Sequence, residues 1–143
     1  MVFLRDKIQK NAFYGCYMLS QITIRDGVTT IDRSAFSGCT KLTTIEIPDS
    51  VTSIGQSAFS NCSSLTKVNI TDLSAWCKIN FGNSSANPLC NGAKLYLNGS
   101  ELTDITIPSD ITELKFAAFF GCSSLISVTI PESVTKISKS AFN

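Results

Sequence analysis

Cysteine is the residue type with the most chemical potential in this 143-residue chain. Four of its six cysteines, Cys16, Cys39, Cys62 and Cys122, each lie four residues after the alanine of an Ala-Phe dipeptide. A thiolate or serine nucleophile normally needs a histidine base, and zinc sites normally use paired CxxC or histidine ligands. The sequence has no histidine and no CxxC pair, so we expect no catalytic residue, no metal site and no cofactor.

The shared spacing predicts that these four thiols form a column inside a repeated structure. Cysteine in such a column acts as a small buried hydrophobe that fills a tight corner. Disulfides between neighbouring coils, which lie about 4.8 Å apart, stay open as the alternative. Cys77 and Cys90 fall outside the spacing and can pair with each other in an oxidising compartment.

Charge and motif content exclude several classes of protein. The net charge is +1 and the Lys and Arg residues are spread along the chain, without the basic stripe of a nucleic-acid binder. No apolar run approaches the roughly 20 residues of a membrane helix. Asp49 and Glu132 lie at repeat turns, and no P-loop or GxGxxG motif is present. The chain is therefore predicted not to be an enzyme, to bind no nucleic acid and to contain no membrane span.

The elements that position these residues follow from the period of the sequence. Ala-Phe recurs at residues 12, 35, 58, 118 and 141. Residues 42–47, LTTIEI, alternate apolar and polar side chains, as a strand with one buried face does. Pro48 then ends the strand because it cannot donate to a ladder. One such unit cannot bury its apolar side, whereas stacked units can, so the period predicts a leucine-rich-repeat solenoid.

Two segments carry a resemblance to a known family. IPDSVTSIGQSAFSNCSSLTKV at Ile47–Val68 and IPESVTKISKSAF at Ile130–Phe142 resemble the BspA-like leucine-rich repeat family. The repeat and the resemblance imply a mostly β solenoid of the α/β type, right-handed and of about five coils. The parallel strands are expected side by side at residues 19–24, 42–47, 65–70, 102–107 and 125–130. The resemblance also implies a surface protein of gut or oral bacteria, or of some protists, involved in adhesion.

The chain is predicted to be a single domain, 1–143, with one interruption. Repeats occupy residues 1–70 and 101–143, and a non-repeating insert occupies residues 71–100. Within the insert, Thr71 or Asp72 can cap a short helix. KLYL at residues 94–97 resembles a strand, and Asn98–Gly99 is a strong signal for a hairpin turn.

The insert contains the three large aromatic residues that no repeat position explains: Trp76, Phe81 and Tyr96. Helical spacing puts Trp76 and Phe81 on one face. Two interpretations stay open. The aromatic side chains either pack back on the solenoid as a local brace, or project as anchors for a protein partner, a role in which aromatics are common.

The outward positions of the predicted strands form a polar and nearly neutral face. Its candidate partner-binding residues are Lys67, Asp104, Thr44, Glu46 and Asn69. The face offers no aromatic platform for a sugar and no acidic cluster suited to calcium. It is either a solvated β-surface or the broad protein-binding face that solenoids tend to present.

Two functions stay open. The first is a non-catalytic protein-binding module, a slice of a longer bacterial adhesion protein at the cell surface or secreted, which binds host or neighbouring-cell proteins. Both ends of the chain fall within a repeat, which leaves end-to-end self-association through uncapped repeats open. The second is a small free-standing cytoplasmic binder or inhibitor of another protein. A starting Met without the apolar segment of a signal peptide favours it.

Overall fold

The chain folds into stacked coils of short strands joined by turns. The computed structural model describes residues 6–143, so residues 1–5 of the expected domain lie outside it. One side of the coils carries β1 (Lys7–Ile8), β2 (Thr30–Ile31), β4 (Ser53–Ile54), β6 (Asn80–Phe81), β10 (Glu113–Leu114) and β12 (Lys136–Ile137). The other side carries β3 (Thr44–Glu46), β5 (Lys67–Ile70), β7 (Lys94–Leu97), β8 (Ser100–Glu101), β9 (Asp104–Thr106) and β11 (Ser127–Thr129). Along the chain, the helix α1 (Leu73–Cys77) lies between β5 and β6. The 3-10 turns η1 (Ser84–Ala86) and η2 (Pro88–Asn91) lie between β6 and β7.

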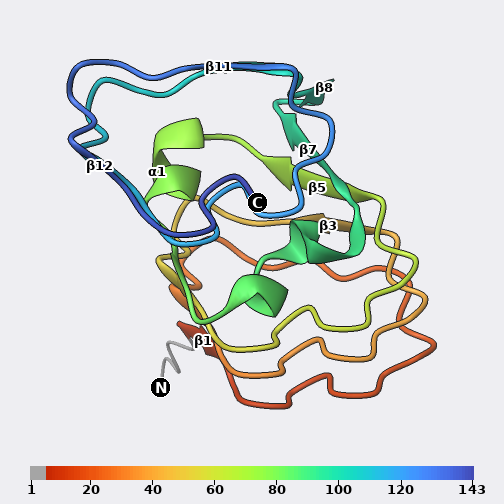
Figure 1. Ribbon diagram of the computed structural model, residues 1–143. Coiled ribbons are helices and arrows are strands. Elements are labelled where there is room, and N and C mark those ends of the chain that lie inside the picture. Colours follow the sequence, from red (N-terminus) through yellow and green to blue (C-terminus); the bar gives the residue numbers. More distant parts are fainter. Residues whose placement is uncertain (1–5) are drawn as a thin grey trace.

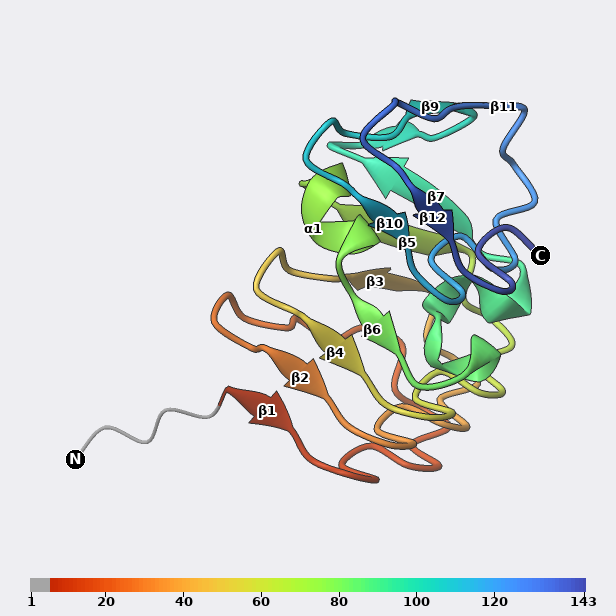
Figure 2. The same ribbon diagram turned by 60° about the vertical axis from the view of Figure 1, so that its left-hand side comes forward.

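The strands form two stacks rather than one continuous array. In the lower stack, residues 6–101, the orders are β1-β2-β4-β6 and β3-β5-β7-β8. In the upper stack, residues 102–143, β10 pairs with β12 and β9 pairs with β11. Figure 1 shows the upper coils in blue and the lower coils in red to yellow. Figure 2 shows α1 between the two sets, and β1, β2, β4 and β6 lying one above another. Strand pairs are parallel except β7–β8 among the residues described.

Within each stack, each coil hydrogen-bonds to the coil that precedes it. The Thr52 amide donates to the Thr29 carbonyl at 2.8 Å, and the Gly55 amide donates to the Ile31 carbonyl at 2.7 Å. The Thr52 hydroxyl also donates to the Thr29 carbonyl, 23 residues earlier, at 3.3 Å. Threonine recurs at this position because its hydroxyl bonds the preceding coil while its β-branched stem favours extended backbone. The sequence period is thus the length of chain that one circuit of the solenoid requires.

Close approach between coils explains two glycines. A Cβ atom on Gly55 would lie 2.5 Å from the Arg33 nitrogen, and one on Gly82 would lie 2.7 Å from the Gln56 nitrogen. Neither distance accommodates a side chain without displacing backbone. Glycine therefore allows β4 and β6 to stack closely on the coils below them.

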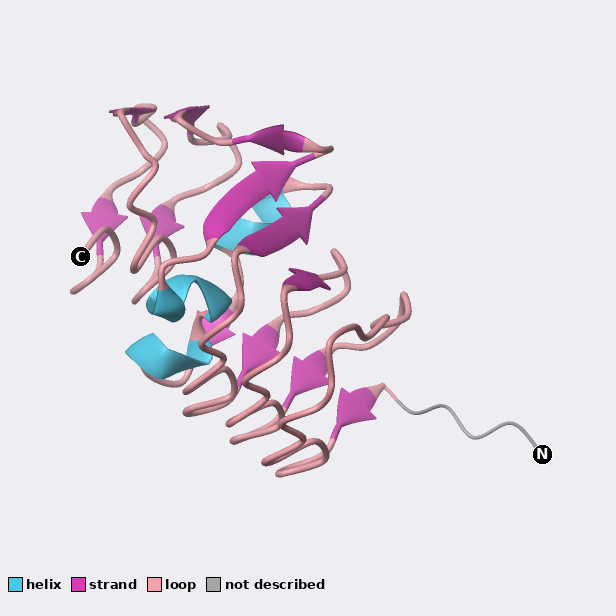
Figure 3. Ribbon diagram, turned by 90° about the vertical axis from the view of Figure 1, so that its right-hand side faces the viewer, coloured by secondary structure: helices cyan, strands magenta, loops and turns pink. Residues whose placement is uncertain are grey.

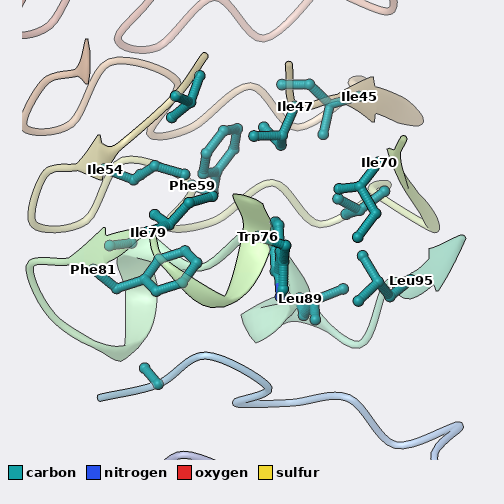
Figure 4. Packing of buried hydrophobic residues seen from close by; sticks show 14 of the residues in the cluster. Ile45, Ile47, Ile54, Phe59, Ile70, Trp76, Ile79, Phe81, Leu89 and Leu95 are labelled. Atoms are coloured by element: carbon teal, nitrogen blue, oxygen red, sulfur yellow. The ribbon is translucent and has the colours of Figure 1, made fainter. Parts of the chain in front are cut away.

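The core is a column of aromatic and aliphatic side chains along the solenoid. The Phe13 and Phe36 rings stack with centroids 5.2 Å apart, and the Phe36 and Phe59 rings stack at 5.3 Å. Phe36 and Phe59 are both fully buried. Figure 4 shows Phe59 among buried isoleucine side chains of several coils. Two of these, Ile45 and Ile47, are the inward positions predicted from the segment LTTIEI.

The predicted cysteine column is present. Cys39 and Cys62 are fully buried. Each of their Sγ atoms lies 3.2 Å from the carbonyl oxygen of the phenylalanine 26 residues earlier. Cys16 is exposed and Cys122 is half-buried. Each lies in a coil that has less of the chain packed against one of its sides than the middle coils have. All six thiols are free.

Cys90 joins this column although its sequence spacing placed it in the insert. Its Sγ lies 3.9 Å from the Phe59 carbonyl oxygen, the position that the other column thiols occupy relative to their neighbours. The Asn91 side chain donates to the same oxygen at 2.8 Å. Cys77 is buried in α1, and it forms no disulfide with Cys90.

The expected solenoid is confirmed, but the side-by-side order of its five predicted strands is wrong. Residues 19–24 form no strand and keep one long bond to the residue before β3, from the Thr43 amide to the Ser20 carbonyl at 3.4 Å. β5 has β7 as its neighbour instead of β9, with Lys67 opposite Lys94. Residues 71–100 supply both β6 and β7, so the insert completes a longer coil of its own (Figure 3). The helix, strand and hairpin predicted within it are present, with Asp72 as the N-cap.

Candidate protein-binding surface

The outward side of β3, β5 and β7 brings most of the predicted partner-binding residues together. Strand register places Thr44 beside Lys67. It also places Asn69 between Glu46 on β3 and Tyr96 on β7. Because side chains alternate along a strand, all five project from the same side of the sheet, while the intervening Ile45, Val68 and Leu95 are buried on the other side. We call this set, together with Lys94 and Glu101, the β3–β5–β7 face.

Charged side chains surround the Tyr96 ring of this face and hold it in place. The Lys67 ammonium lies 4.3 Å from the centroid of the Tyr96 ring, a favourable cation–π distance. The Tyr96 hydroxyl is 3.4 Å from Glu101, and Lys94 forms an ion pair with Glu101 at 2.9 Å. The hydrogen bond that Lys94 donates to Glu101 raises the pKa of Lys94. Both lysines therefore present positive charge beside a half-buried tyrosine.

Sequence reasoning missed Lys94 and Glu101. The available signals were the KLYL strand and the Asn98–Gly99 hairpin, which together place Glu101 opposite Tyr96. Because the sequence did not indicate that β7 would pair with β5, neither residue could be assigned to the same face as Lys67.

Next to the face lies a depression of about 420 Å³. Its lining includes Thr44, Glu46 and Asn69 from the face. The other wall is residues 21–24, where the first coil does not pair with β3. The face is thus a polar sheet surface with a hollow at one end and the Tyr96 cluster at the other.

Trp76 and Phe81 do not belong to this face. Trp76 is 1% exposed and Phe81 is 7% exposed, and their rings contact edge to face at 5.5 Å. Figure 4 shows Trp76 among the core side chains. Its indole Nε1–H donates to the Ala118 carbonyl at 2.9 Å, which ties the insert to the upper stack. The brace interpretation of these two residues is the one that their burial favours.

Asp104 is exposed on β9 and so lies in a different sheet from the face. Its carboxylate accepts hydrogen bonds from the hydroxyls of Ser127 and Thr103. These bonds lower the pKa of Asp104, with the Ser127 bond as the larger cause. The structure therefore separates Asp104 from the other candidate residues by the boundary between the two stacks.

The side chains that could hold a metal ion are dispersed among the described residues. Within residues 6–143, no group of three or more His, Cys, Asp or Glu residues is arranged to hold a metal ion. The buried thiols face carbonyl oxygens, and burial raises the pKa of Cys39 to about 11 and of Cys62 to about 12. A thiol with so high a pKa is a poor nucleophile at neutral pH. In the same described part of the chain, no helix is long and apolar enough to cross a bilayer.

Stacked short parallel strands with a column of phenylalanine and cysteine at the corners define a leucine-rich-repeat solenoid. The sequence profile of the BspA type leucine rich repeat region matches six copies, over residues 6–87 and 92–143. The chain belongs to this family, and leucine-rich repeats of this kind are generally protein-interaction modules. No curated protein matches the sequence.

Solved bacterial structures share the fold. A leucine rich repeat protein of T. pallidum is 27% identical, with a TM-score of 0.55 over 92% of this chain and 66% of that one. A leucine-rich repeat protein from Bacteroides ovatus is 32% identical, with a TM-score of 0.56 over 90% of this chain and 30% of that one. A leucine rich cell surface protein from Faecalibacterium prausnitzii is 31% identical, with a TM-score of 0.52 over 87% of this chain and 38% of that one. The chain thus spans less than two thirds of each of these proteins.

Proposed function

We propose that this chain is a non-catalytic protein-binding module that docks a partner on the β3–β5–β7 face. The observation that carries the proposal is the Tyr96 cluster, in which Lys67 and Glu101 hold a half-buried ring on an otherwise polar sheet. A ring that is already fixed loses little rotamer freedom when a partner covers it. Tyrosine in such a setting is a frequent hot spot of protein interfaces.

The residue types of the chain support a binding function over a catalytic one. The chain has no histidine, and the acidic residues of the face are paired with lysine or exposed singly. Lys67 and Lys94 are adjacent across two strands, so the cluster favours a partner that presents acidic side chains around an apolar contact. The depression beside Glu46 and Asn69 would receive a side chain of the partner, at the end of the interface away from Tyr96.

We further propose that the module acts at a bacterial cell surface, as part of a longer protein that adheres to host or neighbouring-cell proteins. The Faecalibacterium prausnitzii structure is that of a cell surface protein, which supports this setting. The six free cysteines, three of which are buried, favour the second setting, a cytoplasmic binder or inhibitor, because disulfides are rare in reducing compartments.

A pull-down with two sets of prey tests both parts of the proposal. The tagged chain is incubated with host extracellular proteins and, separately, with a lysate of the source cell. The variant Tyr96→Ala removes the ring, and Ser53→Ala on the opposite sheet is the matched control. We expect a partner from the extracellular set whose affinity for Tyr96→Ala is at least about ten-fold weaker, with Ser53→Ala unchanged.

Two results would contradict parts of the proposal. A partner that binds Tyr96→Ala as tightly as the wild type excludes the β3–β5–β7 face. A partner found only in the cell lysate favours the cytoplasmic alternative. Circular dichroism must show that Tyr96→Ala is folded; if it is not, Lys94→Glu, which reverses a charge on the exposed rim, replaces it with the same expected loss.

A further inference from the structure

The two stacks face each other across an interruption of the sheet between β6 and β10. β6 pairs with β4 and β10 pairs with β12, so each strand keeps one free edge. In the part of the chain that the structure describes, no backbone hydrogen bond joins residues 79–82 to residues 112–115. Figure 2 shows β10 above β6 in line with the strands of the lower stack. We call this place the β6–β10 gap.

Alternation along the strands identifies the free backbone groups. The Gly82 amide donates toward β4, to the Ile54 carbonyl at 2.9 Å, so the N–H and C=O of the preceding Phe81 point toward the gap. The Leu114 carbonyl accepts from Ser138 on the far side at 2.8 Å, so the N–H and C=O of Glu113 point toward the gap. Both edges thus offer a donor and an acceptor that one additional strand could pair.

The gap is a cavity and not only a break in the hydrogen bonds. It has a volume of about 350 Å³, within the range of small ligand and peptide pockets. Phe81 and Phe116 supply its apolar lining, and Asn80, Glu113, Lys115 and Ser138 supply its polar lining. The combination suits an extended segment with apolar side chains on one face and polar side chains on the other.

Lys115 determines the charge that the gap prefers. Its ammonium donates to the Lys78 carbonyl at 2.9 Å and to the Asn80 side-chain oxygen at 2.8 Å. Both acceptors are neutral, and Lys115 belongs to none of the ion pairs of the described residues. The nearby Glu113 is engaged by Lys136 at 2.8 Å. A half-buried cation without a carboxylate partner favours an incoming acidic side chain.

We propose that the β6–β10 gap binds one extended, acidic segment of a partner protein as an added β-strand. The segment completes the order β1-β2-β4-β6-segment-β10-β12 by pairing with Phe81 on one side and Glu113 on the other. Its carboxylate takes the Lys115 ammonium, which turns away from the Lys78 carbonyl. Main-chain pairing supplies the affinity of this mode, and the side-chain positions supply the specificity. The site is separate from the β3–β5–β7 face and does not depend on it.

The chain itself supplies a suitable probe. Directly after β2, the Asp32 carboxylate pairs with Lys7 of the preceding coil at 2.9 Å. Asp32 directly follows the inward Ile31, as Lys115 directly follows the inward Leu114. A peptide of residues 28–34, VTTIDRS, aligned in the gap in the register of the coils would therefore place its aspartate beside Lys115.

The test is fluorescence polarisation of labelled VTTIDRS against the complete chain, compared with VTTINRS and a scrambled peptide. We expect VTTIDRS to bind about three-fold more tightly than VTTINRS, the ratio that a partly exposed ion pair supports, and the scrambled peptide not to bind. Lys115→Gln should abolish the preference for aspartate, and the control Lys41→Gln should keep it. Hydrogen exchange should slow at the Phe81 and Glu113 amides when the peptide binds.

Several outcomes would overturn the proposal. Equal binding of the scrambled peptide, no binding at millimolar concentration, or an aspartate preference that survives Lys115→Gln would each do so. If sedimentation shows a dimer that VTTIDRS dissociates, the occupant is a second copy of this chain and not a partner protein. The comparison of VTTIDRS with VTTINRS uses the wild type alone, so it decides the charge preference even if Lys115→Gln does not fold.

Discussion

At the scale of single residues, the corner positions matter most to stability. Phe36 and Phe59 are stacked, fully buried and contributed by successive coils. Each ring packs on the coil before it and the coil after it, so its loss affects two interfaces. The buried cysteines fill the space beside these rings and point at backbone oxygens, which explains why a small, weakly donating side chain recurs there.

Phe59→Ala should lower the free energy of unfolding by about 3–5 kcal/mol, because a fully buried ring is replaced by a cavity. Urea denaturation followed by circular dichroism measures it. Ile126→Ala is the control, since Ile126 is 81% exposed and should change stability by less than about 0.5 kcal/mol. Equal effects of the two substitutions would contradict the placement of Phe59 in the core.

The stabilising contribution of Cys62 should decrease at high pH. Burial raises the pKa of Cys62 from its ordinary 9.0 to about 12, so above pH 9 the unfolded chain loses a proton that the folded chain keeps. Its contribution is complete below pH 9 and is lost as pH rises toward 12. The stability difference between wild type and Cys62→Ala should therefore shrink by about 1.4 kcal/mol between pH 8 and pH 10.

Urea denaturation at pH 8, 9 and 10 measures this difference for both proteins. Ser63→Ala serves as the control because Ser63 is exposed and not ionisable. Its difference from wild type should be the same at each pH. A constant difference for Cys62→Ala as well would show that the thiol is solvated in the folded protein.

At the scale of elements, side chains of the insert form hydrogen bonds to the upper stack where backbone groups bond successive coils in the lower stack. In the lower stack the Ala58 carbonyl accepts the backbone amide of Phe36 at 2.9 Å. The equivalent carbonyl of Ala118 accepts instead the Trp76 indole at 2.9 Å and the Asn87 amide at 3.3 Å. Asn87 also bonds the Ala117 carbonyl at 2.7 Å and is fully buried. The helix α1 and the turn η2 thus join the two stacks.

Asn87→Ala should lower the free energy of unfolding by about 2–4 kcal/mol, because it leaves the buried Ala117 carbonyl without its donor and the buried Leu89 amide without its acceptor. Trp76→Phe keeps an aromatic ring and leaves the Ala118 carbonyl with its Asn87 bond, so its cost should be smaller. Thermal denaturation of the two variants gives the comparison. If Asn87→Ala is as stable as wild type, the junction does not depend on this side chain.

At the scale of the whole molecule, the two stacks differ in how well they are buried. Of the two upper coils, the last leaves Val128 and Val134 half-buried and Ile137 52% exposed. Only the first upper coil, with Ile105 and Leu114, is buried as Val68 and Ile54 of the lower stack are. Exposed ion pairs cross the junction, such as Lys78 with Asp110 at 2.7 Å, and contribute little to stability. The upper stack therefore depends on the junction more than the lower stack does.

Hydrogen exchange in increasing guanidinium should reveal two cooperative units. Amides of residues 113–137 are expected to open at lower denaturant than those of residues 30–70, because fewer buried contacts hold them. Asn87→Ala should lower the opening free energy of the upper stack more than that of the lower stack. A single transition for all amides, in wild type and variant, would show that the stacks unfold as one unit.

The period, the inward leucines and isoleucines, and the corner phenylalanines and cysteines were determined by the sequence itself. Such contacts join residues at a fixed separation of 23, as in the bond of Thr52 to Thr29, so one repeat predicts its neighbours. The longer circuit through residues 71–100 followed no such rule. Only tertiary packing decided that β7 would lie beside β5 and that β6 and β10 would not pair with each other. It also decided that Trp76 would be buried against Ala118 while Tyr96 stayed at the surface. These outcomes depend on contacts between segments with no shared pattern, which local sequence does not encode.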